Sequence, residues 1–147
     1  MKDSGRKKRS ISKTLSANDT GETGAHQAGL LVPKQPPDIL EFFPPLDRSE
    51  LNPRHHLTFY DEKDERWNFA FIYYNNKFFG GTRNEFRLTC MTPFLRESGL
   101  KAGDEIILER SDEGRYLIKY RRAKDSGRGP DGILRLGSNW RVVEIPS

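Results

Sequence analysis

The sequence predicts a mainly β domain whose short strands form a closed or nearly closed antiparallel barrel. Runs in which apolar and polar residues alternate with a period of two recur along the chain. Glycine, proline and asparagine residues separate these runs at short intervals, as turns between strands do. The runs do not alternate with long amphipathic segments, which excludes a sheet built from βαβ units. We therefore expect about seven strands and two short helices.

The length of 147 residues fits a single folded domain. The first 14 residues hold almost no apolar side chains apart from Met1 and Ile11, and they are rich in lysine and arginine. We therefore expect a flexible basic arm over residues 1–14 and the folded domain over residues 15–147. Residues 15–29 are rich in Ser, Asn, Asp, Thr and Gly, which predicts a polar loop.

Proline and glycine residues delimit the predicted elements of the folded domain. Pro33 ends a short strand over Leu30–Val32, and a short helix over Asp38–Phe43 lies between two Pro-Pro pairs. A second helix over Pro93–Ser98 is closed by Gly99. The remaining predicted strands are His55–Tyr60, Trp67–Tyr74, Lys77–Phe79, Phe86–Met91, Glu105–Arg110, Arg115–Arg122 and Trp140–Ile145.

Two predicted turns join neighbouring strands directly. Asn75 and Asn76 form a tight turn before Lys77–Phe79, because asparagine tolerates left-handed backbone better than most residues. Residues 112–114 close the hairpin formed by Glu105–Arg110 and Arg115–Arg122.

The net charge of +4 and the pI of about 9.3 favour a polyanionic partner, although solubility alone also accounts for such values. The positive charge gathers in two places, the first 14 residues and residues 110–128. Either group is suited to contact phosphates, which dominate the affinity of proteins for DNA. The alternative for the first group is a solvated tail.

Several functional classes lack their signatures. No P-loop, dinucleotide fingerprint or Gly-x-Ser-x-Gly elbow occurs. The single cysteine, Cys90, lies in an alternating run and is expected to be a buried thiol, and together with His26, His55 and His56 it makes no zinc pattern. No apolar run reaches the length of a membrane span, and residues 1–14 lack the apolar segment of a secretory signal. We expect a soluble intracellular protein without a metal or cofactor.

Two polar loops, residues 16–27 and 80–87, mix side chains that suit base edges. Arginine can donate two hydrogen bonds to guanine, amides can read adenine, and carboxylates can accept from cytosine. Arg83, Asn84, Glu85 and Arg87 form such a set within five positions. Because phosphate repels a carboxylate, Glu85 favours base recognition over mere charge attraction. The alternative is a structural turn in which Arg83 or Arg87 forms an ion pair with Glu85.

Two other groups of residues allow a functional and a structural interpretation. The acidic residues of Asp61–Glu65 surround Lys63, as in some metal-dependent nucleases, but their place between two strands is typical of an exposed loop. Four aromatic residues are suited to stack on single-stranded bases, while their alternation along the predicted strands favours packing in the core. They are Tyr73, Tyr74, Phe78 and Phe79.

Three blocks of the sequence resemble one known family. The blocks are LSANDTGETGAHQAGLLVP (residues 15–33), ELNP (residues 50–53) and IYYNNKFFGGTRNEFRLT (residues 72–89). They resemble the N-terminal effector-binding domain of EcoRII-type restriction endonucleases, and residues 99–122 look like part of the B3-type DNA-binding pseudobarrel to which that domain belongs. The resemblance implies a seven-stranded open antiparallel pseudobarrel with short helices, whose two arms enter the major groove of duplex DNA.

The resemblance assigns the two arms to Ser16–Gln27, here called the N-arm, and Gly80–Arg87, called the C-arm. The residues expected to contact bases are His26, Arg83, Asn84, Glu85 and Arg87. The residues in or beside the N-arm expected to contact bases or backbone are Lys13, Ser16, Asn18, Asp19, Thr20, Thr23 and Gln27. The residues expected to contact the DNA backbone are Lys77, Thr82, Arg121 and Arg122.

The implied partner is double-stranded DNA with a pseudopalindromic site related to CCWGG, in the bacterial cytoplasm. Full-length EcoRII-type enzymes have a separate nuclease domain, and we expect no catalytic residues in this chain. It is then a part of a restriction enzyme or a stand-alone reader, with any nuclease domain in the same or a partner chain. Two alternatives remain, a metal-dependent nuclease that uses Asp61–Glu65 and a barrel that binds an acidic protein.

Overall fold

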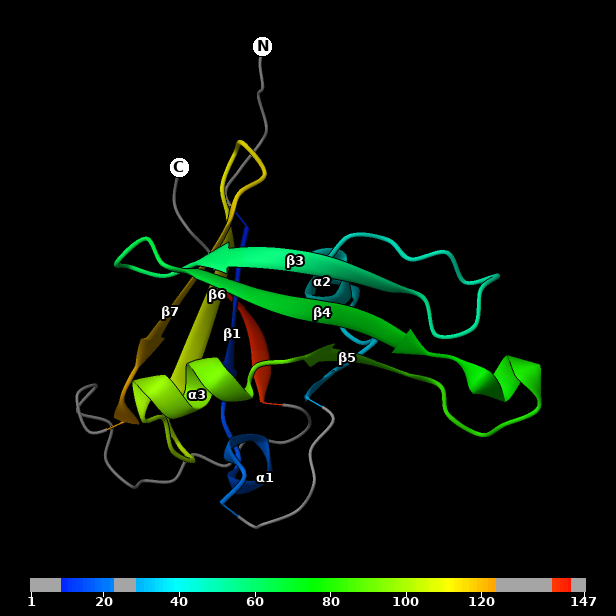
Figure 1. The fold of residues 1–147 in the computed structure, drawn as a ribbon, viewed down its shortest axis with the longest axis horizontal. Coiled ribbons are helices and arrows are strands. Elements are labelled where there is room, and N and C mark those ends of the chain that lie inside the picture. The colour runs from blue at the N-terminus through cyan, green and yellow to red at the C-terminus, as the bar shows by residue number, and fades with distance from the viewer. Residues whose placement is uncertain (1–8, 23–28, 124–138, 144–147) are drawn as a thin grey trace.

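One curled eight-stranded sheet dominates the computed structural model, which describes residues 9–22, 29–123 and 139–143 (Figure 1). The strand order is β2-β5-β4-β3-β7-β6-β1-β8, and neighbours are antiparallel except β3 and β7. The strands are β1 (Arg9–Thr14), β2 (Leu30–Val32), β3 (Arg54–Tyr60), β4 (Arg66–Tyr74), β5 (Glu85–Thr89), β6 (Glu105–Arg110), β7 (Tyr116–Arg121) and β8 (Trp140–Val143). The helices are α1 (Ala17–Thr20), α2 (Pro37–Glu41), η1 (Asn76–Phe79, a 3₁₀ turn) and α3 (Thr92–Ser98).

The core fills the inside of the curl. Period-two alternation directs every second side chain of a strand inward, as Phe69 and Phe71 of β4 do, and both are about 1% exposed. Helices close the remaining openings with aromatic residues. Phe43, just after α2, stacks on Phe71 with ring centroids 4.4 Å apart, and Phe94 of α3 packs edge-on against Trp67. The core is therefore one continuous apolar cluster enclosed by a single sheet.

The two edge strands of the sheet, β2 and β8, are joined by a side chain. The indole Nε1 of Trp140 in β8 donates a hydrogen bond to the carbonyl oxygen of Leu31 in β2 at 2.8 Å. Trp140 is largely buried. This bond lets the sheet curl almost into a barrel without a continuous ladder between its edges, so the predicted mainly β open barrel is confirmed.

β1 corrects the expectation of a flexible arm over residues 1–14. Arg9–Thr14 pairs with both β6 and β8, in the interior of the sheet, and is one of its eight strands. Ile11 points into the core, while Ser10 and Ser12 are buried as well. The strand is thus built largely from polar residues, and its apolar pattern is too weak to reveal it. Residues 1–8 lie outside the described residues.

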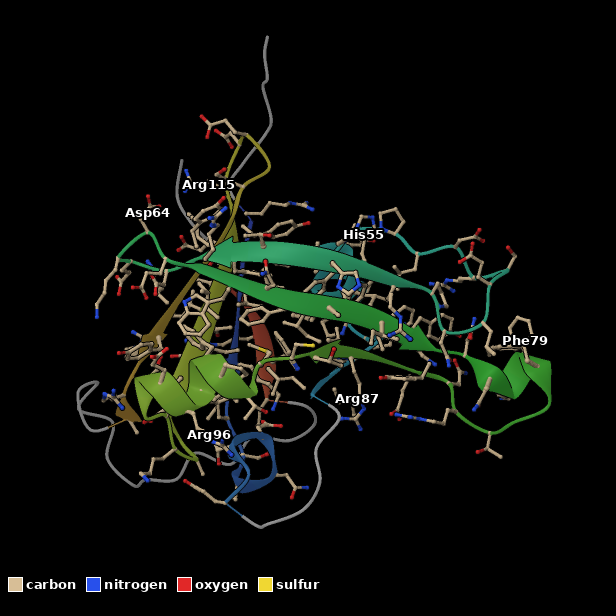
Figure 2. The ribbon with its side chains drawn as sticks, viewed as in Figure 1. His55, Asp64, Phe79, Arg87, Arg96 and Arg115 are labelled. Carbon is tan, nitrogen blue, oxygen red and sulfur yellow. The ribbon has the colours of Figure 1, made fainter. Side chains whose placement is uncertain are left out.

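The segment after β4 also differs from the prediction. Asn76–Phe79 forms η1 instead of a strand, and the αL residue Gly80 (φ 95°) ends it. Since η1 lies beyond the sheet, Phe78 and Phe79 are 64% and 49% exposed, contrary to the expected packing in the core. Figure 2 shows Phe79 at the far end of this projection. Tyr73 is buried, as the alternation predicts.

Cys90 is exposed, contrary to the predicted buried thiol. β5 ends at Thr89, and Cys90 has a left-handed backbone with φ 67°, so the alternation stops one residue before it. The strands Leu30–Val32 and Glu105–Arg110 have the predicted bounds, and the other predicted strands and both predicted helices are present with shifted ends. No helix within the three described ranges is long and apolar enough to cross a membrane.

Removal of the indole N–H in Trp140→Phe should destabilise the fold, because the Leu31 carbonyl loses its partner between the sheet edges. We expect the free energy of unfolding in urea to fall by about 1 kcal/mol, the net contribution of one hydrogen bond. Trp67→Phe is the control. It removes an indole hydrogen bond that is local in the chain and partly exposed, because its acceptor, Asp61, lies in the loop between β3 and β4. An equal loss of unfolding free energy in both variants would mean that the bond between the sheet edges contributes no more than a local hydrogen bond.

Candidate nucleic-acid interface

Residues 80–84 of the C-arm project with η1 beyond β4, at the right of Figure 1, while residues 85–87 form the start of β5. Asn76 closes this projection. Its Oδ1 accepts from the backbone N of Arg83 at 2.6 Å, and its backbone oxygen accepts from the N of Gly81 at 2.6 Å. A side chain at Gly81 would not fit, because a Cβ there would lie 2.6 Å from the Asn76 Cγ. The path of the C-arm is therefore set by hydrogen bonds and by one close approach.

Glu85 holds two arginines at once at the start of β5. Its Oε2 accepts from Nη2 of Arg83 at 2.6 Å and from Nε of Arg87 at 2.7 Å. Arg87 also donates through Nη1 to the carbonyl oxygen of Gly29 at 2.9 Å. We call Arg83, Glu85 and Arg87 the Glu85 cluster. The ion pairs that a structural turn would form between Glu85 and its arginines are thus present. They fix the direction of both guanidinium groups.

The electrostatics of the Glu85 cluster favour the ionised carboxylate. Burial acts to raise the pKa of Glu85, but hydrogen bonds from Arg83 and Arg87 outweigh it and hold the pKa below its ordinary value. The side chain of Arg83 remains 40% exposed and that of Arg87 21% exposed. The cluster therefore presents oriented, solvent-accessible donors beside a fixed negative charge.

The Glu85 cluster belongs to the face of the sheet that is turned away from the core. Phe86 and Leu88 are buried, so Glu85 and Arg87 point to the opposite face. Tyr74 lies opposite Glu85 in the register, and the guanidinium of Arg83 sits over its ring at 4.0 Å. This contact stabilises one orientation of Arg83.

Sequence reasoning missed two members of this face. Arg54 of β3 shares a register row with Ile72 and Arg87, which brings a further cation to the same side of the sheet. For Tyr74 the sequence predicts packing in the core or base stacking, whereas the side chain supports Arg83. Strand register would have revealed both, and register depends on the pairing of strands distant in the sequence.

Asn84, Thr82 and Lys77 also lie on or beside the projecting segment. The Oδ1 of Asn84 accepts from the hydroxyl of buried Tyr73 at 2.5 Å, which leaves its amide NH₂ as a donor. Thr82 is exposed, and the ammonium group of exposed Lys77 lies 5.9 Å from the Phe78 ring centroid. These three predicted residues are brought close to the Glu85 cluster by the chain itself.

The described part of the N-arm begins with a capped helical turn where the sequence predicted a loop. Ser16 caps α1 in a capping box with Asp19, and Gly21 ends the turn with φ 85°. Asp19 also forms an ion pair with Lys13 of β1, whose side chain is 7% exposed. Thr20 donates to the carbonyl of Ala17 at 3.2 Å. Lys13 and Asp19 thus attach α1 to the sheet.

Asn18 in the same turn is exposed. The predicted site residues Thr23, His26 and Gln27 lie outside the described residues.

Arg121 and Arg122 are not brought to the C-arm. Arg121 is the last residue of β7 and Arg122 follows it, near α3 and at the opposite side of the molecule in Figure 1. Arg122 donates to the carbonyls of Ser98 and Gly99, which end α3, and Arg121 bonds Glu105 at 2.8 Å. Their contacts support the fold locally.

Glu105 is a buried carboxylate whose ionisation contributes to the stability of the barrel. Burial raises the pKa of Glu105, but hydrogen bonds from Ser12, Arg141 and Arg121 outweigh this effect and lower the pKa overall. Because the pKa is lower in the folded state, this stabilisation is present above the ordinary carboxyl pKa and is lost as pH falls through the folded value.

The acidic run Asp61–Glu65 organises its own loop. Asp61 accepts from the backbone N of Lys63 and Glu65 and from the indole of Trp67, at 2.8 to 3.0 Å. Asp64 pairs with Arg115 at 2.9 Å. Within residues 9–22, 29–123 and 139–143, no three His, Cys, Asp or Glu side chains gather as a metal site would require. The run therefore has the contacts of a structural loop.

Comparison with known proteins identifies relatives of this chain. The family model "Restriction endonuclease EcoRII, N-terminal" matches residues 6–95. The type II restriction enzyme EcoRII of Escherichia coli is 46% identical over 83 residues, which cover 52% of this chain and 19% of that protein. Auxin response factor 3 of Oryza sativa subsp. japonica is 32% identical over 111 residues, covering 76% of this chain and 14% of that protein.

A solved structure matches the same architecture. The protein of the Arabidopsis FUS3–DNA complex superposes with a TM-score of 0.59 at 21% identity, covering 76% of this chain and 95% of that one. This likeness shows the fold. The chain spans less than a fifth of the length of the curated relatives named above.

Removal of both arginines of the Glu85 cluster should reverse the pKa shift of its carboxyl group. In Arg83→Ala/Arg87→Ala the hydrogen bonds are lost and the effect of burial remains, so the pKa should rise. Carboxyl ¹³C titration by NMR should give a midpoint below the ordinary 4.5 in the wild type and a higher one in the variant. Arg115→Ala is the control and should leave the Glu85 midpoint in place; an unchanged midpoint in the double variant would contradict this account.

Proposed function

Since the chain belongs to the family of EcoRII N-terminal domains and has a B3-like fold, we propose that it binds duplex DNA sequence-specifically through two arms in the major groove. The observation that carries this proposal is the Glu85 cluster. Two guanidinium groups point outward from one sheet face with a carboxylate fixed between them. A surface that only attracts phosphates gains nothing from that carboxylate, whereas base edges present both acceptors and donors.

The chemistry of the cluster suits G·C pairs. Each guanidinium can donate to O6 and N7 of a guanine. The carboxylate can accept from the N4 amino group of a cytosine, since a carboxylate has more acceptor sites than the two arginines occupy. Each half of CCWGG holds two G·C pairs, and we propose such a half-site as the target of the C-arm. The amide of Asn84 adds a donor at the edge of this set.

We propose that the N-arm engages the other half of the pseudopalindrome. Its capped turn exposes Asn18, and its position below the sheet in Figure 1 differs from that of the projecting C-arm. Thr23, His26 and Gln27 are the further candidates in this arm. We propose that Lys77, Thr82 and Arg54 contact the DNA backbone beside the C-arm, which their exposure supports. Contacts of lysine and arginine with phosphates would make the affinity fall with salt.

The wider role follows from the relatives. We propose that the chain recognises target or effector DNA for a restriction enzyme in the bacterial cytoplasm, with nuclease activity in another domain of the same or a partner protein. The enzyme EcoRII of Escherichia coli, of which this chain resembles a fifth, supports this role.

A competition gel shift at near-physiological salt tests the target. We expect a CCWGG duplex to compete at least about a hundredfold better than a scrambled duplex of equal composition, within the range of specific DNA-binding proteins. Equal competition would contradict a CCWGG target, and selection from random duplexes would then distinguish a different site from binding through phosphates alone.

Arg83→Ala should weaken binding to the CCWGG duplex by about 1–3 kcal/mol and relax discrimination at one base pair, because one bidentate guanine contact is lost. The same gel shift with each singly substituted duplex measures this. Arg115→Ala is a matched control: Arg115 also stacks over a tyrosine, Tyr60 at 3.8 Å, and bonds a carboxylate, Asp64. Equal weakening on every duplex would make Arg83 a phosphate contact.

A further inference from the structure

Asn75 is a fully buried polar residue at the point where the chain leaves β4 for η1 and the C-arm. Its Oδ1 accepts from the backbone N of Asn52 at 2.7 Å, and its Nδ2 donates to the carbonyl of Glu50 at 2.8 Å. A longer bond of 3.4 Å reaches the carbonyl of Arg48. A buried amide with these partners is held in one orientation, because each lost bond would leave a polar group unsatisfied.

The contact between Asn75 and Asn52 is reciprocal. The backbone N of Asn75 donates to Oδ1 of Asn52 at 3.3 Å, while the backbone N of Asn52 donates to the side chain of Asn75. We call this pair the Asn52–Asn75 clasp. It joins the ELNP block, residues 50–53, to the end of β4, and the carbonyl oxygen of Pro53 also accepts from the backbone N of Tyr73 at 3.0 Å. The proposed DNA contacts do not use this block.

Hydrogen bonds link the Asn52–Asn75 clasp to the Glu85 cluster through Asn76. Asn76 follows Asn75 in the chain and binds the backbone N of Arg83 through its side chain. The backbone oxygen of Arg83 accepts from the N of Lys77 at 2.9 Å. Arg83 then bonds Glu85. A rotation of the chain at Asn75 would therefore displace Asn76, and with it the guanidinium of Arg83.

We infer that Asn52 and Asn75 are positioning residues that set the direction of the C-arm and thereby its discrimination between DNA sequences. This inference rests on the proposed function. Bidentate contacts with a base edge depend on hydrogen-bond distance and angle, while charge contacts with phosphates tolerate displacement. Loosening the clasp should therefore reduce specific binding and leave non-specific binding nearly unchanged.

Asn52→Gly tests the clasp with little strain. Asn52 has φ 52°, which glycine adopts readily, and the substitution removes the Oδ1 acceptor but keeps the backbone N–H that binds Asn75. We expect the preference for CCWGG over a scrambled duplex to fall about tenfold, comparable to one mismatched base pair. Binding to the scrambled duplex should stay within about twofold of the wild type, and the amide of Arg83 should exchange hydrogen faster in the free protein.

Two further variants separate positioning from general destabilisation. Ser49→Ala removes an exposed hydrogen bond to Asp47 in the same loop without touching the clasp, and it should leave both the preference and the Arg83 exchange unchanged. Asn75→Asp keeps the size but sets a carboxylate against the carbonyls of Glu50 and Arg48, and it should lower the preference further. If Asn75→Asp does not fold, Asn52→Gly decides alone.

The outcomes distinguish this inference from the proposed function. A wild-type protein without sequence preference overturns the proposed function itself. A wild-type preference that Asn52→Gly retains in full overturns the positioning role. Unchanged hydrogen exchange of the Arg83 amide in Asn52→Gly also overturns the positioning role, whatever the DNA results. Equal losses of affinity for both duplexes would overturn it as well and would show that the clasp only stabilises the fold.

Discussion

A single sheet with one apolar face must bury that face against itself, and this constraint shapes the whole molecule. The sheet curls until its edge strands β2 and β8 are close enough for the Trp140 indole to bond the Leu31 carbonyl. The inside is then filled by core residues, with aromatic side chains from the segment just after α2 and from α3 in the openings. Polar chemistry is left to the outer face and to the segments between strands.

In the Glu85 cluster, the residues that we propose to read bases are already held by ion pairs with one another. Placing a carboxylate between two arginines has a desolvation cost, and the lowered pKa of Glu85 indicates that the hydrogen bonds exceed it. The cluster also fixes the rotamers of Arg83 and Arg87 before any partner arrives, so less conformational entropy is lost on binding. Tyr74 beneath Arg83 and Gly29 beside Arg87 restrict them further.

Sequence periodicity predicted the strands whose apolar residues alternate, above all β4 with its inward Phe69 and Phe71. It missed β1, because serines and a paired lysine fill buried positions there and Ile11 alone carries the pattern. It grouped the members of the Glu85 cluster, since they are neighbours in the chain, but it assigned them to a loop, whereas Glu85 and Arg87 belong to β5. Tyr74, Arg54 and the Asn52–Asn75 clasp depend on register and on contacts between distant segments, which local patterns do not contain.

The curled sheet with its apolar core, here called the frame, is thus held by a different kind of interaction from the arms. The frame depends on burial, which is proportional to area and tolerates exchange of one apolar residue for another of similar volume, so related barrels can diverge widely in sequence. The arms depend on individual atoms, such as Oε2 of Glu85 and Oδ1 of Asn76, which few substitutions reproduce. Shared architecture therefore preserves the frame from one relative to another, whereas a proposed target has to be argued from the polar atoms that each chain presents.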